Sequence, residues 1–363
     1  MKELSAIIHE YLKVEGVIGT GIATIETLAG GPPSSDLTYA MPTAKSAVVF
    51  ALPLNLDAIP DYLSKKDRTT YETDYIRQSS MGNGIAVKLA NFLIAKGHPS
   101  TALAVNEVYR DDNPGDGLRM YPPISLRYLA AASGVGFLGY SGNLLTKDYG
   151  AAIILGGLVT EAELIPDSPF DESENYCDDC HLCCGGCPSK SLQGQKRVTI
   201  TMGGHDHSYG KKHGNLPCAF VCGGFSGLSD SGKWSTWSPG RFPLPHTDED
   251  TVAVYRGNVD AFNKRPKCPG GRYHTMSDNP IYYVCSNCQL ICAPDKEERK
   301  RRFELLTHAG VIVQNEDGTL DAVTPEEAKK RLAAMTPERR ALYEGEIEPD
   351  TKAMAKFEEF SMG

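Results

Sequence analysis

The sequence contains no hydrophobic run long enough to cross a membrane. Its two longest apolar stretches, residues 46–54 and 151–159, fall well short of the ~20 residues that a membrane-spanning helix needs. The N-terminal residues alternate charged and apolar side chains, so they lack the apolar core of a secretory signal peptide, and no twin-arginine signal is present. These absences predict a cytoplasmic protein with no membrane partner.

The chain also lacks an excess of basic residues. Its 363 residues include 37 Lys and Arg against 46 Asp and Glu, which gives a formal net charge of −9. General nucleic-acid binders normally carry a basic excess, so this balance weighs against such a function, although it leaves room for a local basic patch. With 41% hydrophobic and 23% charged residues, the composition excludes collagen-like, coiled-coil and wholly disordered proteins.

Cysteine is present in an intermediate amount. Eleven cysteines are too few for a small disulfide-rich fold and too many for an ordinary core. Most of them lie in two short windows, residues 177–187 and 285–292, and such clustering is typical of metal ligands. A reducing compartment would keep these thiols available for iron.

The first window, Cys177-x2-Cys180-x2-Cys183-x3-Cys187-Pro188, matches the cysteine run of bacterial ferredoxins. Three closely spaced thiolates can bind three irons of one [4Fe–4S] cube, while the fourth, before a proline, serves a second cube. Tetrahedral zinc needs only two close pairs of ligands, so the three-plus-one spacing favours iron.

The second window supplies Cys285, Cys288 and Cys292. Under the cross-ligation rule, Cys292 completes the cube of the first three cysteines, and the other cube takes Cys187, Cys285 and Cys288. This assignment gives seven ligands where two cubes need eight. We favour Cys268, just upstream of the second window, as the eighth ligand. The alternatives are Cys218, Cys222 and Cys184.

Patterns of apolar residues and glycine divide the chain into three stretches. Residues 1–165 predict an α/β domain, in which the apolar runs indicate buried strands and a long helical pattern ends at Gly97. The expected strands cover residues 46–52, 101–105 and 149–159, and the expected helices 74–96 and 124–133. Residues 166–294 predict a ferredoxin-like iron–sulfur module, and residues 295–363 a helical extension with threonine caps.

The module contains an insertion at residues 195–266 that is rich in Gly, Ser, His and Pro and is predicted to be mostly loop. Its two tryptophans, Trp234 and Trp237, suggest a small packing centre of its own that covers a substrate pocket. Its histidines are interpreted as surface residues; they are His205, His207 and His213.

One segment before the first cysteine window resembles a known family. Residues 123–145, PISLRYLAAASGVGFLGYSGNLL, are followed by Tyr149-Gly and Leu155-Gly-Gly, and then by the cysteines. This order of parts resembles the epoxyqueuosine reductases and the reductive dehalogenases, over residues 40–190 and 266–294. The resemblance implies a nitroreductase-like α/β domain that holds base-off cobalamin, with two [4Fe–4S] clusters reducing its cobalt to Co(I).

The resemblance also implies a cobalamin site at the glycine-rich turn. Glycine fits this role because only bare backbone lets a flat macrocycle approach to van der Waals distance. The residues expected to line the corrin are Gly134, Gly136, Gly139, Ser141, Gly142 and Asn143.

Three departures from the family pattern bear on the substrate. The position of the general-acid aspartate of epoxyqueuosine reductases falls at Met120, the lysine that often follows the turn is replaced by Tyr140, and the insertion is unusually long. Reductive dehalogenases use a tyrosine as proton donor, so Tyr121, next to the vacant acid position, is the candidate donor here. The departures disfavour tRNA and favour a small-molecule substrate.

The leading hypothesis is therefore a cobalamin-dependent iron–sulfur reductase of an unidentified electrophilic substrate, supplied with electrons by a ferredoxin or flavodoxin. One alternative is an epoxyqueuosine reductase that acts on tRNA. The other is an iron–sulfur electron-transfer protein without cobalamin.

Overall fold

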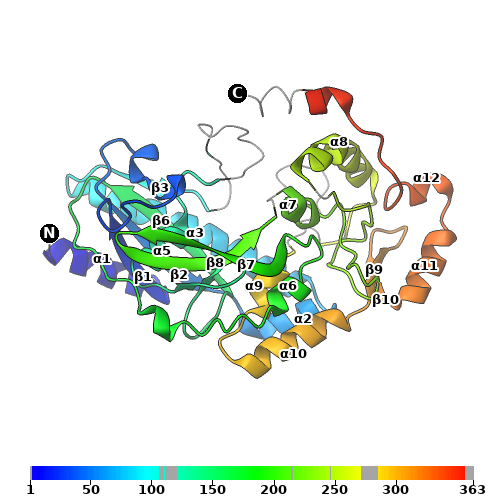
Figure 1. Cartoon of the computed structure of the whole chain (residues 1–363), viewed down its shortest axis with the longest axis horizontal. Coiled ribbons are helices and arrows are strands. Elements are labelled where there is room, and N and C mark those ends of the chain that lie inside the picture. The colour runs from blue at the N-terminus through cyan, green and yellow to red at the C-terminus, as the bar shows by residue number, and fades with distance from the viewer. Residues whose placement is uncertain are drawn as a thin grey trace.

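A computed structural model describes residues 2–105, 110, 121–213, 216–245, 247–270 and 285–355. The chain mixes helices and strands, as the sequence predicts (Figure 1). Its main sheet has four strands in the order β1–β2–β6–β3, and each neighbouring pair is antiparallel. The strands are β1 (Gly19–Thr24), β2 (Ser46–Pro53), β6 (Ile153–Thr160) and β3 (Ser100–Leu103).

The central strand β2 is buried on both faces because nearly all of its side chains are apolar. Alternate residues such as Val48 and Phe50 belong to a cluster with α1 (Lys2–Val14) and the 27-residue α3 (Thr69–Ala95). The residues between them, such as Val49, pack with α5 (Leu126–Ala132) on the opposite face. The period of two along a strand thus places the sheet between two helical layers.

The insertion is far more ordered than its composition suggests. It contains a long hairpin of β7 (Leu192–Met202) and β8 (His205–Lys212), followed by α7 (Leu216–Cys222) and α8 (Asp248–Lys264). Gly203 and Gly204, both with positive φ, make the two-residue turn of the hairpin. The prediction of a mostly loop insertion was therefore wrong, because the Gly-Gly turn between two strands of β-branched and polar residues was not recognised.

Both tryptophans of the insertion are buried in the main core. Trp237 donates a hydrogen bond from Nε1 to the carbonyl oxygen of Tyr62, at 3.0 Å, and its ring lies 6.0 Å from that of Tyr62. Tyr62 belongs to α2 (Ile59–Leu63), which precedes α3 in the first stretch of the chain. The tryptophans therefore join the insertion to the first stretch, and the interpretation of a separate covering element is wrong.

The second cysteine window forms α9 (Asn287–Ile291), and α10 (Lys296–Thr307) follows it. The last stretch adds α11 (Pro325–Ala333) and α12 (Pro337–Arg340), each begun by a threonine whose side chain accepts a hydrogen bond from a backbone amide. This stretch also contains a small hairpin of β9 (Val311–Gln314) and β10 (Leu320–Val323), which the sequence analysis did not predict.

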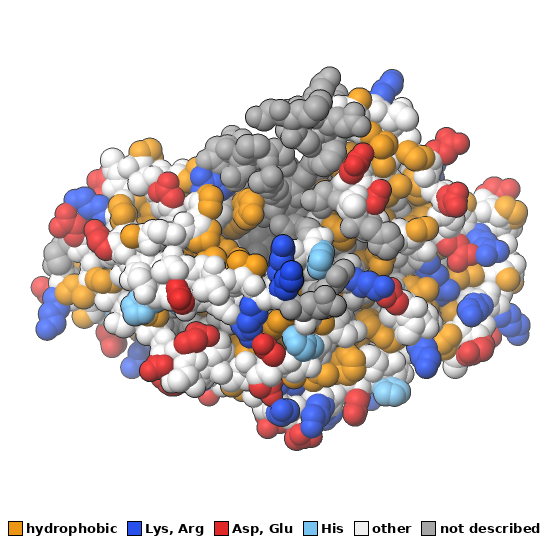
Figure 2. Space-filling model, viewed as in Figure 1, with side chains coloured by type: hydrophobic (Ala, Val, Ile, Leu, Met, Phe, Trp, Pro, Cys, Tyr) orange, Lys and Arg blue, Asp and Glu red, His pale blue; other side chains and the backbone are white. Residues whose placement is uncertain are grey.

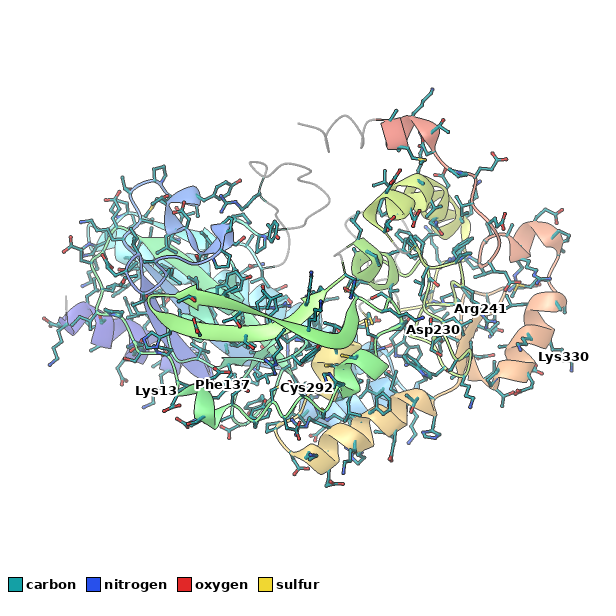
Figure 3. All side chains as sticks on the ribbon, viewed as in Figure 1. Lys13, Phe137, Asp230, Arg241, Cys292 and Lys330 are labelled. Atoms are coloured by element: carbon teal, nitrogen blue, oxygen red, sulfur yellow. The ribbon has the colours of Figure 1, made fainter. Side chains whose placement is uncertain are left out.

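The molecule has two parts, and acidic and basic side chains are interspersed over the face of both that Figure 2 shows. The main sheet and the insertion hairpin form one part, while α7, α8 and the C-terminal elements form the other (Figure 1). Cys292 lies near the junction of the two parts in Figure 3. No helix among the described residues is long and apolar enough to span a membrane.

Candidate metal centre

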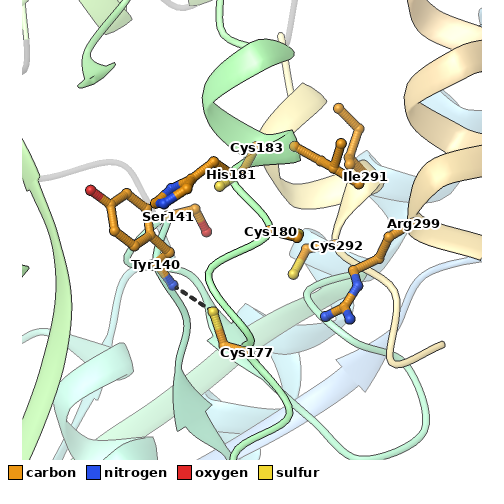
Figure 4. Close-up of a pocket in the computed structure, with 10 residues that line it drawn as sticks. Tyr140, Ser141, Cys177, Cys180, His181, Cys183, Ile291, Cys292 and Arg299 are labelled. Atoms are coloured by element: carbon orange, nitrogen blue, oxygen red, sulfur yellow. Dashed lines mark hydrogen bonds between the residues drawn. The ribbon is translucent and has the colours of Figure 1, made fainter. Parts of the chain in front are cut away.

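The first cysteine set surrounds a cavity between the first window and α9 (Figure 4). The cavity is lined by four cysteines together with Tyr140, His181 and Arg299. These cysteines are Cys177, Cys180, Cys183 and Cys292. The cross-ligation rule had grouped the same four, so the structure brings together from two distant windows the residues expected to hold one cube.

Each cysteine window contains a residue with a left-handed backbone conformation, which turns the chain between its cysteines. His181 (φ 54°) immediately precedes the short helix α6 (Leu182–Gly185), and Ser286 (φ 49°) holds the matching place before α9. Few non-glycine residues adopt a left-handed conformation, and it reverses the chain within one residue. A left-handed residue therefore follows Cys180 in the first window and Cys285 in the second.

The second cysteine set adjoins the first and gains a member from the insertion. Burial raises the pKa of Cys285. The neighbouring thiols Cys222, Cys288 and Cys187 raise it further, which shows that they lie near Cys285. Cys222, at the end of α7, accepts hydrogen bonds from the backbone amides of Cys285 and Ser286. Burial raises the pKa of Cys222, and these two amides partly offset that rise because they favour the thiolate.

Cys268 lies away from both sets. It is buried, and its Sγ lies 3.4 Å from Nη2 of Arg68, which is ion-paired with Glu72 at 3.2 Å. Burial raises the pKa of Cys268, and the other groups that shift it are Arg68 and Glu72, with no cysteine among them. The structure therefore places Cys268 against a buried ion pair, whereas the sequence analysis favoured it as the eighth ligand.

The remaining two cysteines occupy the edges of the site. Cys218, one turn before Cys222 on α7, is exposed at the surface. Cys184 lies in the first window but does not line the cavity, and its Sγ is 3.9 Å from Nδ1 of His181. The groups that shift the pKa of Cys218 include Cys222, Cys288 and Cys187, so Cys218 also lies near the second set, whereas hydrogen bonds from the second window reach Cys222.

The described residues contain no group of three His, Cys, Asp or Glu side chains arranged to hold a single metal ion. Thiolates of an iron–sulfur cube bind separate irons and need not converge on one point. The donor chemistry of both cysteine sets, four sulfurs each, fits such a cluster.

The glycine-rich turn contacts both cysteine sets. The backbone amide of Tyr140 donates to Sγ of Cys177 at 3.2 Å (Figure 4), and Nδ2 of Asn143 donates to Sγ of Cys288 at 3.6 Å. Ser141, between them, lines the first cavity. The turn thus bridges the two sets, and two of the residues expected to line a corrin, Ser141 and Asn143, face the cysteines.

The glycines of this turn are required by close packing against protein. A Cβ atom on Gly134 would lie 2.4 Å from the carbonyl oxygen of Ser168, and one on Gly136 would lie 2.4 Å from that of Leu145. On Gly139 it would lie 2.7 Å from a methyl carbon of Leu145. These three glycines therefore do not face an open cradle that a cobalamin could fill.

Gly142, the last glycine of the turn, lies beneath the insertion hairpin. A Cβ atom there would meet Cε of Lys212 at 3.6 Å and the ring of Tyr209 at 3.8 Å, while Nη1 of Arg127 donates to its carbonyl oxygen at 3.1 Å. The described residues of the turn thus do not fit a corrin. The sequence analysis did not predict that Tyr209 and Lys212 lie beside the turn. The Gly203-Gly204 pair could have placed both residues on a strand of a hairpin.

Tyr121, the candidate proton donor, is 40% exposed. The neighbouring hydroxyls of Tyr128 and Tyr209 are 3.2 Å apart. Burial, followed by this hydrogen bond, raises the pKa of Tyr128, and Tyr121 contributes to the same shift. Met120, at the position of the family's general acid, lies outside the described residues.

The three histidines of the insertion divide into two kinds. His205 and His213 are exposed, as expected. His207 is buried against the first part of the molecule, and burial lowers its pKa. The surface interpretation is wrong for His207, because the expected loop is a strand whose alternate side chains turn inward.

Gly150 provides a test of how β6 and the second window are joined. It has φ +61°, and a Cβ atom there would lie 2.2 Å from the carbonyl oxygen of Cys292. We expect Gly150→Ala to displace Cys292 and to reduce the iron bound by the first set, measured as iron per chain after anaerobic reconstitution.

Gly204→Ala is the matched control for that substitution. Gly204 has φ +82°, and a Cβ atom there would have no other atom within 4 Å. The change should cost only the left-handed strain of about 1–2 kcal/mol and leave the iron content unchanged. Equal iron loss in both variants would show that strain alone, and not contact with Cys292, causes the effect.

No protein-family model matches the chain. Among curated proteins, the epoxyqueuosine reductase of Lactococcus garvieae is 40% identical over 70 residues, which are 19% of each chain. That of Atelocyanobacterium thalassa is 27% identical over 183 residues, covering 49% of this chain and 53% of the relative. This chain therefore spans at most about half the length of these two relatives.

Solved structures of epoxyqueuosine reductases and reductive dehalogenases match this chain with low TM-scores. A structure of epoxyqueuosine reductase with a tRNA-Tyr epoxyqueuosine-modified stem loop is 15% identical, covers 99% of both chains and has a TM-score of 0.43. A catabolic reductive dehalogenase is 16% identical over 55% of this chain and 26% of its own, with a TM-score of 0.41. Scores this low do not establish a common fold, so the relationship rests on the sequences. In sequence, the chain is similar to epoxyqueuosine reductases over part of its length.

Proposed function

We propose that the protein is an iron–sulfur oxidoreductase that holds two [4Fe–4S] clusters and delivers electrons from a ferredoxin or flavodoxin to a bound substrate. This proposal rests on one observation: eight cysteines, from the two windows and α7, lie in two adjacent groups of four. We call Cys177, Cys180, Cys183 and Cys292 the first cluster site, and Cys187, Cys222, Cys285 and Cys288 the second cluster site.

Cys222 is the proposed eighth ligand in place of Cys268. Its hydrogen bonds from the amides of Cys285 and Ser286 place its sulfur beside the second window. Cys268, by contrast, has Arg68 and Glu72 as its charged neighbours. Amide donors to a ligating sulfur are among the factors that set the potential of a cluster.

Cobalamin is the part of the expected cofactor set with least support from the described residues. If bound, it would supply Co(I) as the reductant of the substrate, as the family resemblance implies. The described glycines pack against protein, and Ser141 and Asn143 face the cysteines. Any corrin would therefore need contacts other than the turn predicted from the sequence.

The relatives favour reduction of epoxyqueuosine in tRNA over the small-molecule substrate that the sequence analysis preferred. Both curated proteins named above are epoxyqueuosine reductases. We therefore take epoxyqueuosine-containing tRNA as the first substrate to test. Tyr121, exposed and close to the tyrosine pair, stays the proposed proton donor.

A small electrophilic molecule is the second candidate, because the β7–β8 hairpin narrows the approach to the turn. Tyr209 and Lys212 of β8 lie directly over Gly142, within 4 Å of a methyl group placed there. A large RNA substrate would have to reach the cluster sites past this hairpin.

The first experiment measures composition and then activity. The protein is purified anaerobically with cobalamin supplied, its clusters are reconstituted, and iron, sulfide and cobalt are quantified per chain. We expect about eight irons, since each [4Fe–4S] cluster contains four. About four irons or fewer would contradict the two-cluster proposal, and the cobalt content decides whether cobalamin is part of the enzyme.

The loaded protein is next incubated with reductant and an epoxyqueuosine-modified tRNA stem loop, and queuosine formation is measured by mass spectrometry. Turnover that falls in Tyr121→Phe would support both the substrate and the donor. No product with a protein that carries all its clusters would exclude the tRNA substrate and leave the small-molecule candidate.

A further inference from the structure

We infer that Lys212 and Arg127 raise the reduction potential of the second cluster site above that of the first, so that electrons entering the protein come to rest on the second cluster. This inference rests on the proposed function, since it needs both clusters. It assigns a role to two residues outside the cysteine windows, one on the insertion hairpin and one on α5.

The geometry places both cations at the edge of the second cluster site. Nη1 of Arg127 donates to the carbonyl oxygen of Gly142 at 3.1 Å, and Lys212 packs its Cε and Nζ against the same glycine. The next residue, Asn143, donates to Sγ of Cys288 at 3.6 Å. The two cations therefore meet at the turn residue that precedes the contact with a ligand of the second cluster.

Neither cation has an acidic partner among the residues that the structure describes. The ion pairs of those ranges include neither Lys212 nor Arg127. Burial and then Arg127 lower the pKa of Lys212, and the nearby thiols Cys218, Cys288 and Cys187 oppose that shift by favouring its charged form. Two like charges held together without a carboxylate indicate that an anionic group belongs beside them, and a reduced iron–sulfur cluster with its thiolates is one.

Cations at the first cluster site, in contrast, are paired with carboxylates, three cations with two acidic side chains. Asp178 pairs with Lys296 at 2.8 Å and with Arg299 at 3.4 Å, and Asp179 pairs with Arg197, whose Nε lies 3.0 Å from a carboxylate oxygen. A paired cation attracts an added electron less than an unpaired one does, because the carboxylate opposes it. The two sites therefore differ in the net charge that surrounds them.

Other influences on the potential act in both directions. The amides of Cys285 and Ser286, which donate to Cys222, also favour reduction of the second cluster. Each site receives one hydrogen bond from the turn, from the Tyr140 amide at the first and from the Asn143 side chain at the second. Burial of the second site disfavours the extra negative charge of reduction. The same low dielectric also strengthens the attraction of Lys212 and Arg127, which solvent would otherwise screen.

The consequence is a direction for electron transfer. Cys180 of the first site is exposed, so a donor protein can approach that cluster from solvent. The second cluster lies next to Gly142, Lys212 and Tyr209, on the side of the tyrosine pair. An electron would move from the accessible cluster of lower potential to the cluster of higher potential beside the proposed substrate side.

Lys212→Met tests the inference in the protein that carries both clusters. The variant and the unaltered protein are titrated anaerobically with dithionite, and the clusters are followed by EPR. Signals of the second cluster are assigned as those absent from Cys222→Ala. We expect the midpoint potential of the second cluster to fall in Lys212→Met, while that of the first stays where it was.

Lys211→Met is the matched control, because Lys211 is exposed on the same strand and points the other way. It should shift neither potential, and Lys212→Arg should restore the potential that Lys212→Met loses. Arg127→Met provides an independent variant, with a fall of the same sign.

The outcomes separate this inference from the proposed function. Fewer than about eight irons in the unaltered protein would contradict the two-cluster proposal itself. Eight irons, with second-cluster potentials unchanged in both Lys212→Met and Arg127→Met, would overturn the inference and leave the proposed function standing. A first cluster that is reduced before the second in the unaltered protein would also overturn it.

Discussion

Cys222→Ala should remove about half of the iron from the reconstituted protein, from about eight atoms per chain to about four. The sulfur of Cys222 accepts hydrogen bonds from the amides of Cys285 and Ser286, so it lies where a fourth ligand of the second cluster must lie. With alanine there, one iron of that cube has no protein thiolate. The measurement is iron and sulfide per chain, combined with EPR of the reduced protein, in which one of two cluster signals should disappear.

Cys268→Ala is the control that the chain itself offers. Its thiol is buried beside Arg68 and Glu72, and its loss removes a weak contact from the guanidinium without touching either cluster site. We expect both clusters to remain. Half of the iron lost in Cys268→Ala, with none lost in Cys222→Ala, would restore the ligand that the sequence analysis preferred.

A third variant, Cys218→Ala, resolves the choice within α7. Cys218 and Cys222 are four residues apart, so they lie on the same side of the helix, one turn from each other. Cys218 is exposed, whereas Cys222 meets the second window. Iron content should therefore survive the loss of Cys218, and iron loss in this variant alone would move the ligand one turn along the helix.

Sequence spacing could predict the sharing of ligands between windows but not the eighth ligand. The rule that the fourth cysteine of a run serves the other cube is local in the sequence, and it grouped Cys292 with the first three cysteines, which line one cavity with it. The eighth ligand depends on how the insertion folds back on the second window, which is a matter of tertiary packing. Cys268 is nearer to Cys285 in the sequence, yet Cys222 is the neighbour of Cys285 in space.

The fold shows the same division between local and tertiary information. Strands 46–52 and 149–159 were recognisable because both are continuous apolar runs, and they pair as β2 and β6. The hairpin β7–β8 was missed because its strands are polar on one face, although the Gly203-Gly204 turn is a local signal for it. The place of Lys212 over Gly142 follows from that hairpin and could not be read without it.

Trp237→Ala should produce the largest loss of stability among single substitutions in the insertion. The indole is 6% exposed, donates to the carbonyl oxygen of Tyr62 at 3.0 Å and packs near that ring. Truncating a buried tryptophan typically costs about 3–5 kcal/mol, and the carbonyl would also lose its donor. Thermal unfolding of the anaerobic protein, followed by circular dichroism, should show a marked fall in the midpoint temperature.

This substitution should also weaken the second cluster before the first. The ring of Trp237 lies beneath Lys65, with 5.6 Å from Nζ to the ring centre, and burial lowers the pKa of Lys65 to about 7 while the nearby Cys285 opposes that shift. Loss of the indole removes the packing that holds this side of the second cluster site. EPR of Trp237→Ala during gentle warming should therefore show the signal absent from Cys222→Ala disappearing first.

Two further variants separate packing from hydrogen bonding at Trp237. Trp237→Phe keeps most of the buried area and loses only the N–H donor, so its midpoint should lie between those of the unaltered protein and Trp237→Ala. Lys233→Ala, at an exposed position of the same segment, should leave the midpoint unchanged. If Trp237→Ala kept the full stability and altered only the KM for substrate, the tryptophan would belong to a movable cover after all. The hydrogen bond to Tyr62 argues against that result, because a cover that opened would have to break this bond and expose the indole at each turnover.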